Sequence, residues 1–351
     1  FTAQFNVHRV ERHRLVRAGA TYHAQNQDFV TSVDYDVHLS DILEDADGSL
    51  LFVDMGAWFN FGCPTSKIAK PQILGAIYRV RRPGAATIAD PWGKSLELNS
   101  RSVAELVALL DDPRPKVRDQ VVGRLAALGG PSVAALAETI RQQQAPQSRS
   151  AQARLEAVWA LCRIGTAEAQ AALRGALADG DLAVRQAAVH AAGLLNDRQA
   201  SAALAAIVVQ GEPQLRLKAA ESLGRIGQPD AVGAILESLR QGSIDRHLEH
   251  ALIFALIRIN DRAATMVGLE DPNPRVRQAA LVALDQMPNG RLTDDVVVPL
   301  LDTDDPDLQQ AALECISRRP GWSDRTVELM RQWLASQKLS AAQEHSLSGA
   351  L

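Results

Sequence analysis

From about residue 98 onward, apolar positions recur with the 3.6-residue rhythm of amphipathic helices. The strongest such segments are 116–129, 153–165, 184–195, 215–227, 248–260, 276–287 and 308–319. Aligned with one another, they place a polar residue in one column, at intervals of 28 to 36 residues: Arg118, Arg154, Arg185, Arg216, Glu249, Arg277 and Gln309. A period in this range predicts stacked two-helix units, none of which can bury its apolar face alone.

Shorter helical segments lie between these, at 131–143, 167–178 and 229–241. The helices are separated by turns that carry Asp and Pro, such as "DDPRP" (111–115) and "EDPNP" (270–274). Aspartate caps a helix well and proline fits its first turn. We therefore expect about seven helix pairs, with capping helices at 99–110 and 339–351.

The first ninety residues follow a different pattern, which is typical of strands and loops. Strand character is strongest in "DFVTSVDYDVHL" (28–39), "SLLFVD" (49–54) and "GAIYRVRR" (75–82). Asp47-Gly48 predicts a tight hairpin turn, because such a turn needs positive φ. The sequence thus predicts a mainly α protein: a small all-β segment at 1–82, a linker at 83–97 and an α-solenoid at 98–351.

Composition narrows the class of partner. The chain has 351 residues, 46% of them hydrophobic, and 37 Lys and Arg against 41 Asp and Glu, a net charge of -4. This balance gives no reason to expect a nucleic-acid partner, and no apolar run reaches the roughly 20 residues that cross a bilayer. The sequence begins with Phe1, without a signal segment, and we expect it to start within a domain.

The arginines of the column, Arg118, Arg154, Arg185, Arg216 and Arg277, allow two interpretations. They could form a ladder for an anionic ligand. They could instead bind turn aspartates, as Arg277 would bind Asp271 or Asp304, and so fix how the units stack. We favour the structural ladder, because the interruptions at Glu249 and Gln309 would weaken a ligand site more than a stack of helices.

Motifs for metal binding are incomplete. The segment "DTDDPD" (302–307) begins like a calcium loop, but Asp307 and Leu313 stand where Gly and Glu are needed, so helix capping is the better explanation. His247 and His250 share one helix face, but no third ligand lies nearby in the sequence. We predict no metal site.

The remaining reactive or aromatic side chains also have simple explanations. Cys162, Cys315, Trp159 and Phe254 fall in the apolar rhythm of their helices, so we expect them to pack in the core. Cys63 lies in a Gly-Cys-Pro loop without an adjoining basic residue, which argues against a nucleophile.

Five polar or aromatic residues lie near predicted strand ends of the β segment: His38, Asp41, Asp54, Trp58 and Arg79. Strand ends can line a ligand pocket, so these residues are candidates for ligand binding. The alternative, which we favour, is that Asp41 and Asp54 close turns and that Arg79 lies on an exposed strand face.

The repeated helices resemble HEAT-like repeats of the phycobilisome-lyase type, with the signature D-P-x-x-x-V-R-x-A-A-x-A-L-G-x-I-G. Seven units cover residues 98 to about 337. This resemblance implies an α-solenoid and says little about function.

Residues 36–82 resemble the last blade of a sugar-dehydrogenase-type β-propeller, as found in large secreted bacterial proteins sometimes labelled membrane-bound dehydrogenases. The shared elements are a D-G-S-L-L-x-V-D strand, a G-x-W loop, a C-P-T-S loop and a G-x-I-Y-R strand, at 47–54, 56–58, 63–66 and 75–79. The chain departs from the pattern at Met55, Ala57, Phe59 and Gly62. In that family, HEAT-like repeats and often a c-type cytochrome domain follow the propeller.

Ninety residues make at most about two blades of the roughly four or more that a propeller needs, and the chain has no CxxCH motif. The resemblance therefore implies a piece of a larger periplasmic or extracellular protein, without cofactor or catalysis of its own. We expect a protein-interaction or spacer scaffold, whose partner is another protein or a neighbouring domain. The alternatives are part of a quinone-dependent sugar or alcohol dehydrogenase coupled to a cytochrome c, and phycobilisome-lyase-like chromophore attachment.

Overall fold

The structure is a computed structural model, and it describes residues 1–57, 70, 72–143, 149–242, 244–335, 339, 343–344 and 347. The chain forms two compact units. One comprises Phe1–Ala18 and Tyr22–Thr139, and the other comprises Gly19–Thr21 and Ile140–Leu351. The first holds the strands and the first three α-helices, and the second holds the remaining helices.

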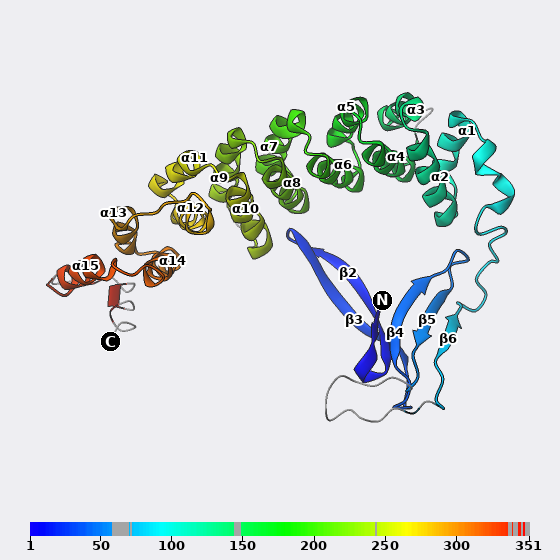
Figure 1. The fold of residues 1–351 in the computed structure, drawn as a ribbon, viewed down its shortest axis with the longest axis horizontal. Coiled ribbons are helices and arrows are strands. Elements are labelled where there is room, and N and C mark those ends of the chain that lie inside the picture. Colours follow the sequence, from blue (N-terminus) through cyan, green and yellow to red (C-terminus); the bar gives the residue numbers. More distant parts are fainter. Residues whose placement is uncertain are drawn as a thin grey trace. The chain divides into compact units, whose positions relative to one another are not determined.

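Two three-stranded sheets open the first unit (Figure 1). Their strands, in order, are β1 (Thr2–Gln4), β2 (Arg9–Ala18) and β3 (Thr21–Thr31), then β4 (Leu39–Glu44), β5 (Leu50–Asp54) and β6 (Ala76–Val80). Both neighbours of β5 run antiparallel to it. Val10, Leu39 and Phe52 form a small core between the sheets, each at most 2% exposed. Gly48 adopts φ 76° in the turn between β4 and β5, which confirms the predicted hairpin.

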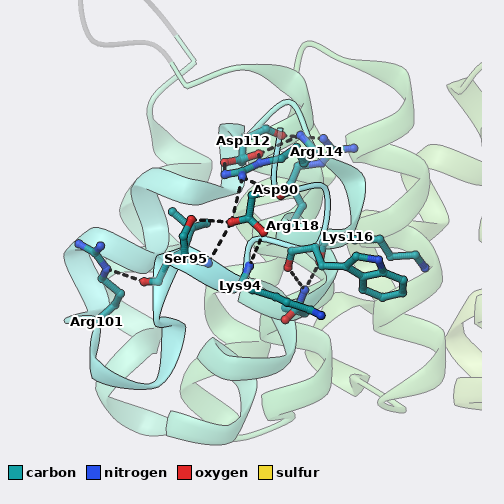
Figure 2. A network of polar contacts seen from close by, with 11 residues as sticks. Asp90, Lys94, Ser95, Arg101, Asp112, Arg114, Lys116 and Arg118 are labelled. Atoms are coloured by element: carbon teal, nitrogen blue, oxygen red, sulfur yellow. Dashed lines mark hydrogen bonds and ion pairs between the residues drawn. The ribbon is translucent and has the colours of Figure 1, made fainter. Parts of the chain in front are cut away.

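The segment after the sheets is attached to a helix. It leads through η2 (Lys94–Leu96), η3 (Leu98–Ser100), α1 (Val103–Ala108) and η4 (Leu109–Asp111) to α2 (Pro115–Leu128) and α3 (Gly130–Arg141). Figure 2 shows the Asp90 carboxylate accepting the amides of Lys94 and Ser95, at 2.8 and 2.9 Å, while its carbonyl accepts from Arg114. The end of the predicted linker is therefore held against α2, and the predicted domain boundaries stay a prediction.

The second unit is a solenoid of helix pairs, which confirms the predicted fold class. Its α-helices are α4 (Ala151–Ile164), α5 (Ala167–Gly175), α6 (Leu182–Leu194), α7 (Ser201–Gln210), α8 (Pro213–Ile226), α9 (Val232–Arg240), α10 (Arg246–Ile259), α11 (Arg262–Met266), α12 (Pro274–Gln286), α13 (Asp294–Val297), α14 (Pro306–Ser317) and α15 (Ser323–Ala335). Figure 1 shows α4, α6, α8, α10 and α12 side by side in one row, with α5, α9 and α11 in a second row.

Short 3-10 helices connect or extend several of these: η5 (Ala176–Ala178), η6 (Arg198–Ala200), η7 (Pro229–Ala231), η8 (Val267–Glu270) and η9 (Val298–Leu301), with η1 (Phe5–Val7) among the strands. No helix in the part of the chain that the structure describes is both long and apolar enough to cross a membrane. The predicted C-terminal helix at 339–351 lies almost entirely outside the described residues.

Helix ends follow from the turn residues that the sequence places there. The Asp181 carboxylate accepts from the amides of Ala183 and Val184, and Asp305 caps α14 by accepting from Leu308. The segment 302–307 therefore leads into a helix start, as the capping prediction expected. Gly165 and Gly227 end α4 and α8 with left-handed backbone, at φ 67° and 69°.

Small residues let helices of the first row approach closely. A Cβ on Gly193 of α6 would lie 2.6 Å from Ser222 Oγ and 2.9 Å from the Cα of Ser222, on α8. The Ser222 hydroxyl donates to the carbonyl of Val189 at 2.8 Å, which joins the same two helices. Glycine inside a helix costs stability, so its place here is explained by the space that it leaves for α8.

The close approach predicts that a Gly→Ala substitution lowers the stability at one helical glycine and raises it at another. Gly193→Ala should destabilise the protein by about 1–3 kcal/mol, because the new methyl group meets the backbone of α8. Gly233→Ala is the control, since nothing lies within 4 Å of that position; it should stabilise by up to about 1 kcal/mol. Urea denaturation measures both, and stabilisation by Gly193→Ala would contradict the packing.

Candidate functional site

The arginine column binds mainly main-chain carbonyls in the turns. Arg118, Arg185 and Arg277 donate to the carbonyls of Asp112, Asp179 and Asp271, at 2.7, 2.7 and 2.8 Å. Arg216 and Gln309 do the same with the carbonyls of Val208 and Leu301, both at 3.0 Å. Arg277 thus contacts Asp271 through the backbone rather than the carboxylate that the sequence suggested. These contacts favour the structural interpretation of the column.

A second set of arginines binds the carboxylates of three buried residues, Asp179, Asp197 and Asp271, which we call the turn aspartates. Each carboxylate accepts the amide two residues further along the chain. Each also binds a guanidinium from an earlier helix: Arg154, Arg174 and Arg240, respectively. The side chains of the turn aspartates are at most 4% exposed. Arg154 is therefore a column member that holds a buried carboxylate, whereas Arg185 binds the exposed carboxylate of Glu212 at 2.5 Å.

The candidate residues of the β segment do not converge on one site. The Asp54 carboxylate accepts the amides of His38 and Gly56, so it closes a turn at one end of β5. Arg79 binds Asp45 at 2.7 Å, near the hairpin at the other end of β5. Asp41 accepts the amide of Ile42. Trp58 lies outside the described residues, and a ligand role for these positions stays a prediction.

The cysteines offer no activated thiol in the part that can be described. Burial, followed by the negative charge of Asp285, raises the pKa of Cys315 to about 12. Burial also raises the pKa of Cys162. Both thiols stay protonated near neutral pH, which suits the predicted packing role. Cys63 lies outside the described residues, and within them no group of three or more His, Cys, Asp or Glu is placed to hold a metal ion.

A groove of about 700 Å³ runs between α8 and α10. Its apolar part is formed by Leu217, Gly224, Ala251 and Phe254. Gly224 lets the helices come together, since a Cβ there would lie 3.0 Å from the Cα of Ala255. The groove is therefore shaped by the close packing of α8 against α10.

Phe254 corrects the prediction that it packs in the core, because its side chain is 50% exposed. Its ring lies nearly parallel to that of His250, with centroids 6.4 Å apart and 6° between the planes. The helix α10 is apolar around most of its circumference, so periodicity alone does not decide which apolar side is buried. Ala251 and Ala255 occupy the buried side instead.

Three arginines surround the apolar part of the groove: Arg225, Arg246 and Arg258. All three are exposed, and within the described ranges none forms a hydrogen bond or an ion pair. Among the described residues that line the groove, Glu221 carries the one carboxylate, and it is bound to Lys218 at 2.7 Å. His247 and His250 add polar edges. The groove thus presents excess positive charge beside an exposed aromatic ring.

Equivalent positions on α4 and α6 extend this surface. Trp159 and His190 meet edge to face, with ring centroids 6.2 Å apart, and Leu194 is 50% exposed. Burial and then the charges of Lys218 and Arg225 hold the pKa of His190 below its ordinary value. The imidazole is therefore neutral near pH 7, and the arginines provide the charge. We call the exposed side of α4, α6, α8 and α10 the α4–α10 face.

Sequence reasoning missed the groove arginines, although a signal for two of them was present. Arg225 and Arg258, like Arg163 on α4, stand nine residues after members of the arginine column. A second arginine column in aligned repeats therefore indicates the exposed face. Which column binds turns and which faces solvent depends on how each helix is rotated against its neighbours.

Comparisons with known proteins agree with this architecture. Residues 141–214 match the family model of HEAT repeats, and residues 215–241 match the model of PBS lyase HEAT-like repeats. These two segments are HEAT-like repeats. No curated protein matches the chain.

Several solved structures are similar. One is the complex of CpcE and CpcF of phycocyanin lyase from Nostoc sp. PCC7120, at 20% identity and a TM-score of 0.36, covering 66% of this chain and 94% of that chain. An archaeal HEAT-like repeats protein from Thermococcus onnurineus NA1 matches at 13% identity and a TM-score of 0.37, covering 69% and 93%. Yeast importin-β (Kap95p) matches at 14% identity and a TM-score of 0.37, covering 70% and 41%.

The buried pair of Arg154 and Asp179 predicts a large effect of removing one partner. Arg154→Met should cost about 3–5 kcal/mol, because it leaves the Asp179 carboxylate buried without its guanidinium. Arg163→Met on the same helix is the matched control, since Arg163 is exposed; it should change stability by less than about 0.5 kcal/mol. Chemical denaturation compares the two, and equal effects would show that the pair is not structural.

The Asp271 carboxylate also predicts loss of stability in acid. Burial opposes ionisation of Asp271, but the Arg240 guanidinium and the Asn273 amide outweigh it and hold the pKa of Asp271 below its ordinary value. Such a group stabilises the fold above the unfolded-state pKa of about 3.9. This contribution is lost as pH falls through the lower folded-state pKa.

We therefore expect the unfolding free energy of the wild type to decrease between about pH 5 and pH 2. In Asp271→Asn, which cannot titrate at this position, the decrease should be smaller, although the variant is less stable near neutral pH. Urea denaturation across this range measures the slopes. A slope unchanged by the substitution would show that Asp271 does not contribute.

Proposed function

We propose that this chain is a protein-binding scaffold, which presents the α4–α10 face to a partner protein or to a neighbouring domain of a larger parent. The observation that carries the proposal is the groove between α8 and α10. There, Arg225, Arg246 and Arg258 have no bound carboxylate or carbonyl within the described ranges, and they lie beside the half-exposed Phe254.

The physical argument rests on the contrast with the rest of the solenoid. Where arginines serve the fold, they bind carbonyls or the turn aspartates, as Arg154 and Arg277 do. Within the described residues, the half-exposed Phe254 ring and the three arginines beside it make no such contact with a neighbouring helix pair, so the stacking of the helices does not explain them. Aromatic residues and arginine are the types that dominate binding energy at protein interfaces, where they are surrounded by polar residues.

The stacked helices support such a surface. Ala219, Leu223 and Leu252 are at most 1% exposed beneath the groove, so α8 and α10 are fixed against their neighbours. A partner would bind to a surface that is already ordered, which reduces the entropy that association costs. The scaffold needs no reacting group and no cofactor in this chain.

A finer hypothesis concerns the parent protein. The antiparallel strands β4, β5 and β6, with Asp47-Gly48 in the first turn, support the resemblance of residues 36–82 to the last blade of a propeller. On that hypothesis the parent is a periplasmic or extracellular quinone-dependent dehydrogenase, and the solenoid spaces its propeller from a cytochrome domain. The reading frame on both sides tests it. Further blades upstream and a CxxCH motif downstream are expected, and a frame without them contradicts it.

A second alternative follows from residues 215–241, which cover α8 and α9 and match the PBS lyase HEAT-like model. It assigns the groove to a phycobiliprotein partner during chromophore attachment. The discriminating measurement is the absorbance of a phycobiliprotein incubated with its bilin, with and without this chain. A bilin adduct that forms faster with the chain would favour this alternative over a plain scaffold.

The proposed scaffold function is tested by comparing variants in protein capture. The immobilised full chain and its double variant Arg225→Glu, Arg258→Glu are exposed to a lysate of the source organism, and bound proteins are quantified by mass spectrometry. We expect at least one protein to be depleted about tenfold or more on the double variant. Arg198→Glu is the control, because Arg198 is exposed on η6 and does not line the groove. Equal capture by all three chains would contradict the proposal.

A further inference from the structure

We infer that the groove between α8 and α10 binds an acidic linear peptide segment that places an aromatic side chain beside Phe254. This inference rests on the proposed scaffold function and names the chemistry of its partner. It is carried by the charge of the groove, by the position of its one carboxylate and by the parallel rings of His250 and Phe254.

The charge of the groove selects acidic side chains. Arg225 on α8 and Arg246 and Arg258 on α10 supply three guanidiniums around one cavity, and each is exposed. Guanidinium binds carboxylate through two parallel hydrogen bonds, and such pairs are stronger than hydrogen bonds between neutral groups. Because no residue of the described ranges occupies these donors, Asp or Glu of a partner would not have to displace an existing ion pair.

The aromatic ring gives the second part of the recognition. Phe254 and His250 lie one helical turn apart, and both side chains are exposed with their rings nearly parallel. Leu217 and Ala251 continue the apolar surface into the groove. An aromatic side chain of the partner can pack here in an offset or edge-on geometry. The carboxylates on either side of it would then reach the arginines.

The position of Glu221 favours a peptide over a nucleic acid, which also combines negative charge with aromatic rings. Glu221 lies one turn before Arg225 on α8 and lines the same groove. Its carboxylate would repel a continuous phosphate backbone, whereas it could accept a main-chain amide of a peptide. The groove also spans only two neighbouring repeats, and the whole chain carries a net charge of -4.

The experiment uses the full chain and fluorescein-labelled peptides in an anisotropy titration. The main probe is a peptide of Asp and Glu residues around one central Trp. Three further probes are the same peptide with Trp→Ser, the same peptide with Lys in place of each acid, and an oligothymidine of similar length. We expect micromolar binding of the main probe, binding about tenfold weaker after Trp→Ser, and weaker binding as salt rises.

Three variants locate the site: Phe254→Ser, the double variant Arg225→Glu, Arg258→Glu, and the control Arg198→Glu. The first should weaken binding of the main probe about tenfold, and the double variant about a hundredfold. The control should bind as the wild type does. Thermal melting and circular dichroism verify that all variants are folded. Because the replaced side chains are exposed, we expect unchanged melting temperatures.

Several outcomes would overturn the inference: no binding of the main probe at about 100 μM protein, equal or tighter binding of oligothymidine, or equal losses in the control variant. Tighter binding of the Lys peptide, abolished by Phe254→Ser, would overturn the acidic chemistry while leaving the scaffold function intact. Unchanged protein capture by the groove variants would instead contradict the scaffold function itself. The two failures are thus distinguishable.

Discussion

The solenoid depends on carboxylates buried in its turns. Asp179 illustrates the constraint: its side chain is fully buried, accepts the amide of Asp181 and binds two nitrogens of Arg154 from the preceding helix pair. A buried carboxylate without such partners would be very costly, so the turn and the earlier helix must adopt one geometry together. Asp271 with Arg240 repeats the arrangement further along the chain. Stacking of successive units is thereby fixed by specific polar contacts as well as by apolar burial.

The arginines of the solenoid are of two kinds, because only some of them are needed to fix the stacking. One kind is held by turn carbonyls and carboxylates, where its hydrogen bonds are satisfied within the fold. The other kind, which includes Arg225 and Arg258, stands on the exposed face of the same helices. Since the first kind already fixes the stacking, the second is available for binding. The groove arises where Gly224 brings α8 and α10 together under these exposed residues.

The bounds of the strongly periodic helices could be predicted closely. The segment 215–227 became α8 (Pro213–Ile226), because Pro213 and Gly227 stand at the two ends of an apolar rhythm. Cys315 was assigned correctly to the core, since one face of α14 alone is apolar. Phe254 was misassigned for the opposite reason. On α10, apolar residues occupy most sides of the helix. The spacing of apolar residues therefore does not show which side is buried.

The sequence by itself determined the helical repeat, the hairpin at Asp47-Gly48 and the positions of the caps, because each depends on residues close together in the chain. Only the tertiary structure decided which arginine binds which turn. The partner of Arg277 proved to be the carbonyl of Asp271, while the carboxylate of that residue binds Arg240, 31 residues away. It also decided that Arg225, Arg258 and Phe254 share one groove. Such contacts depend on the rotation and spacing of packed helices, which close-range sequence patterns do not encode.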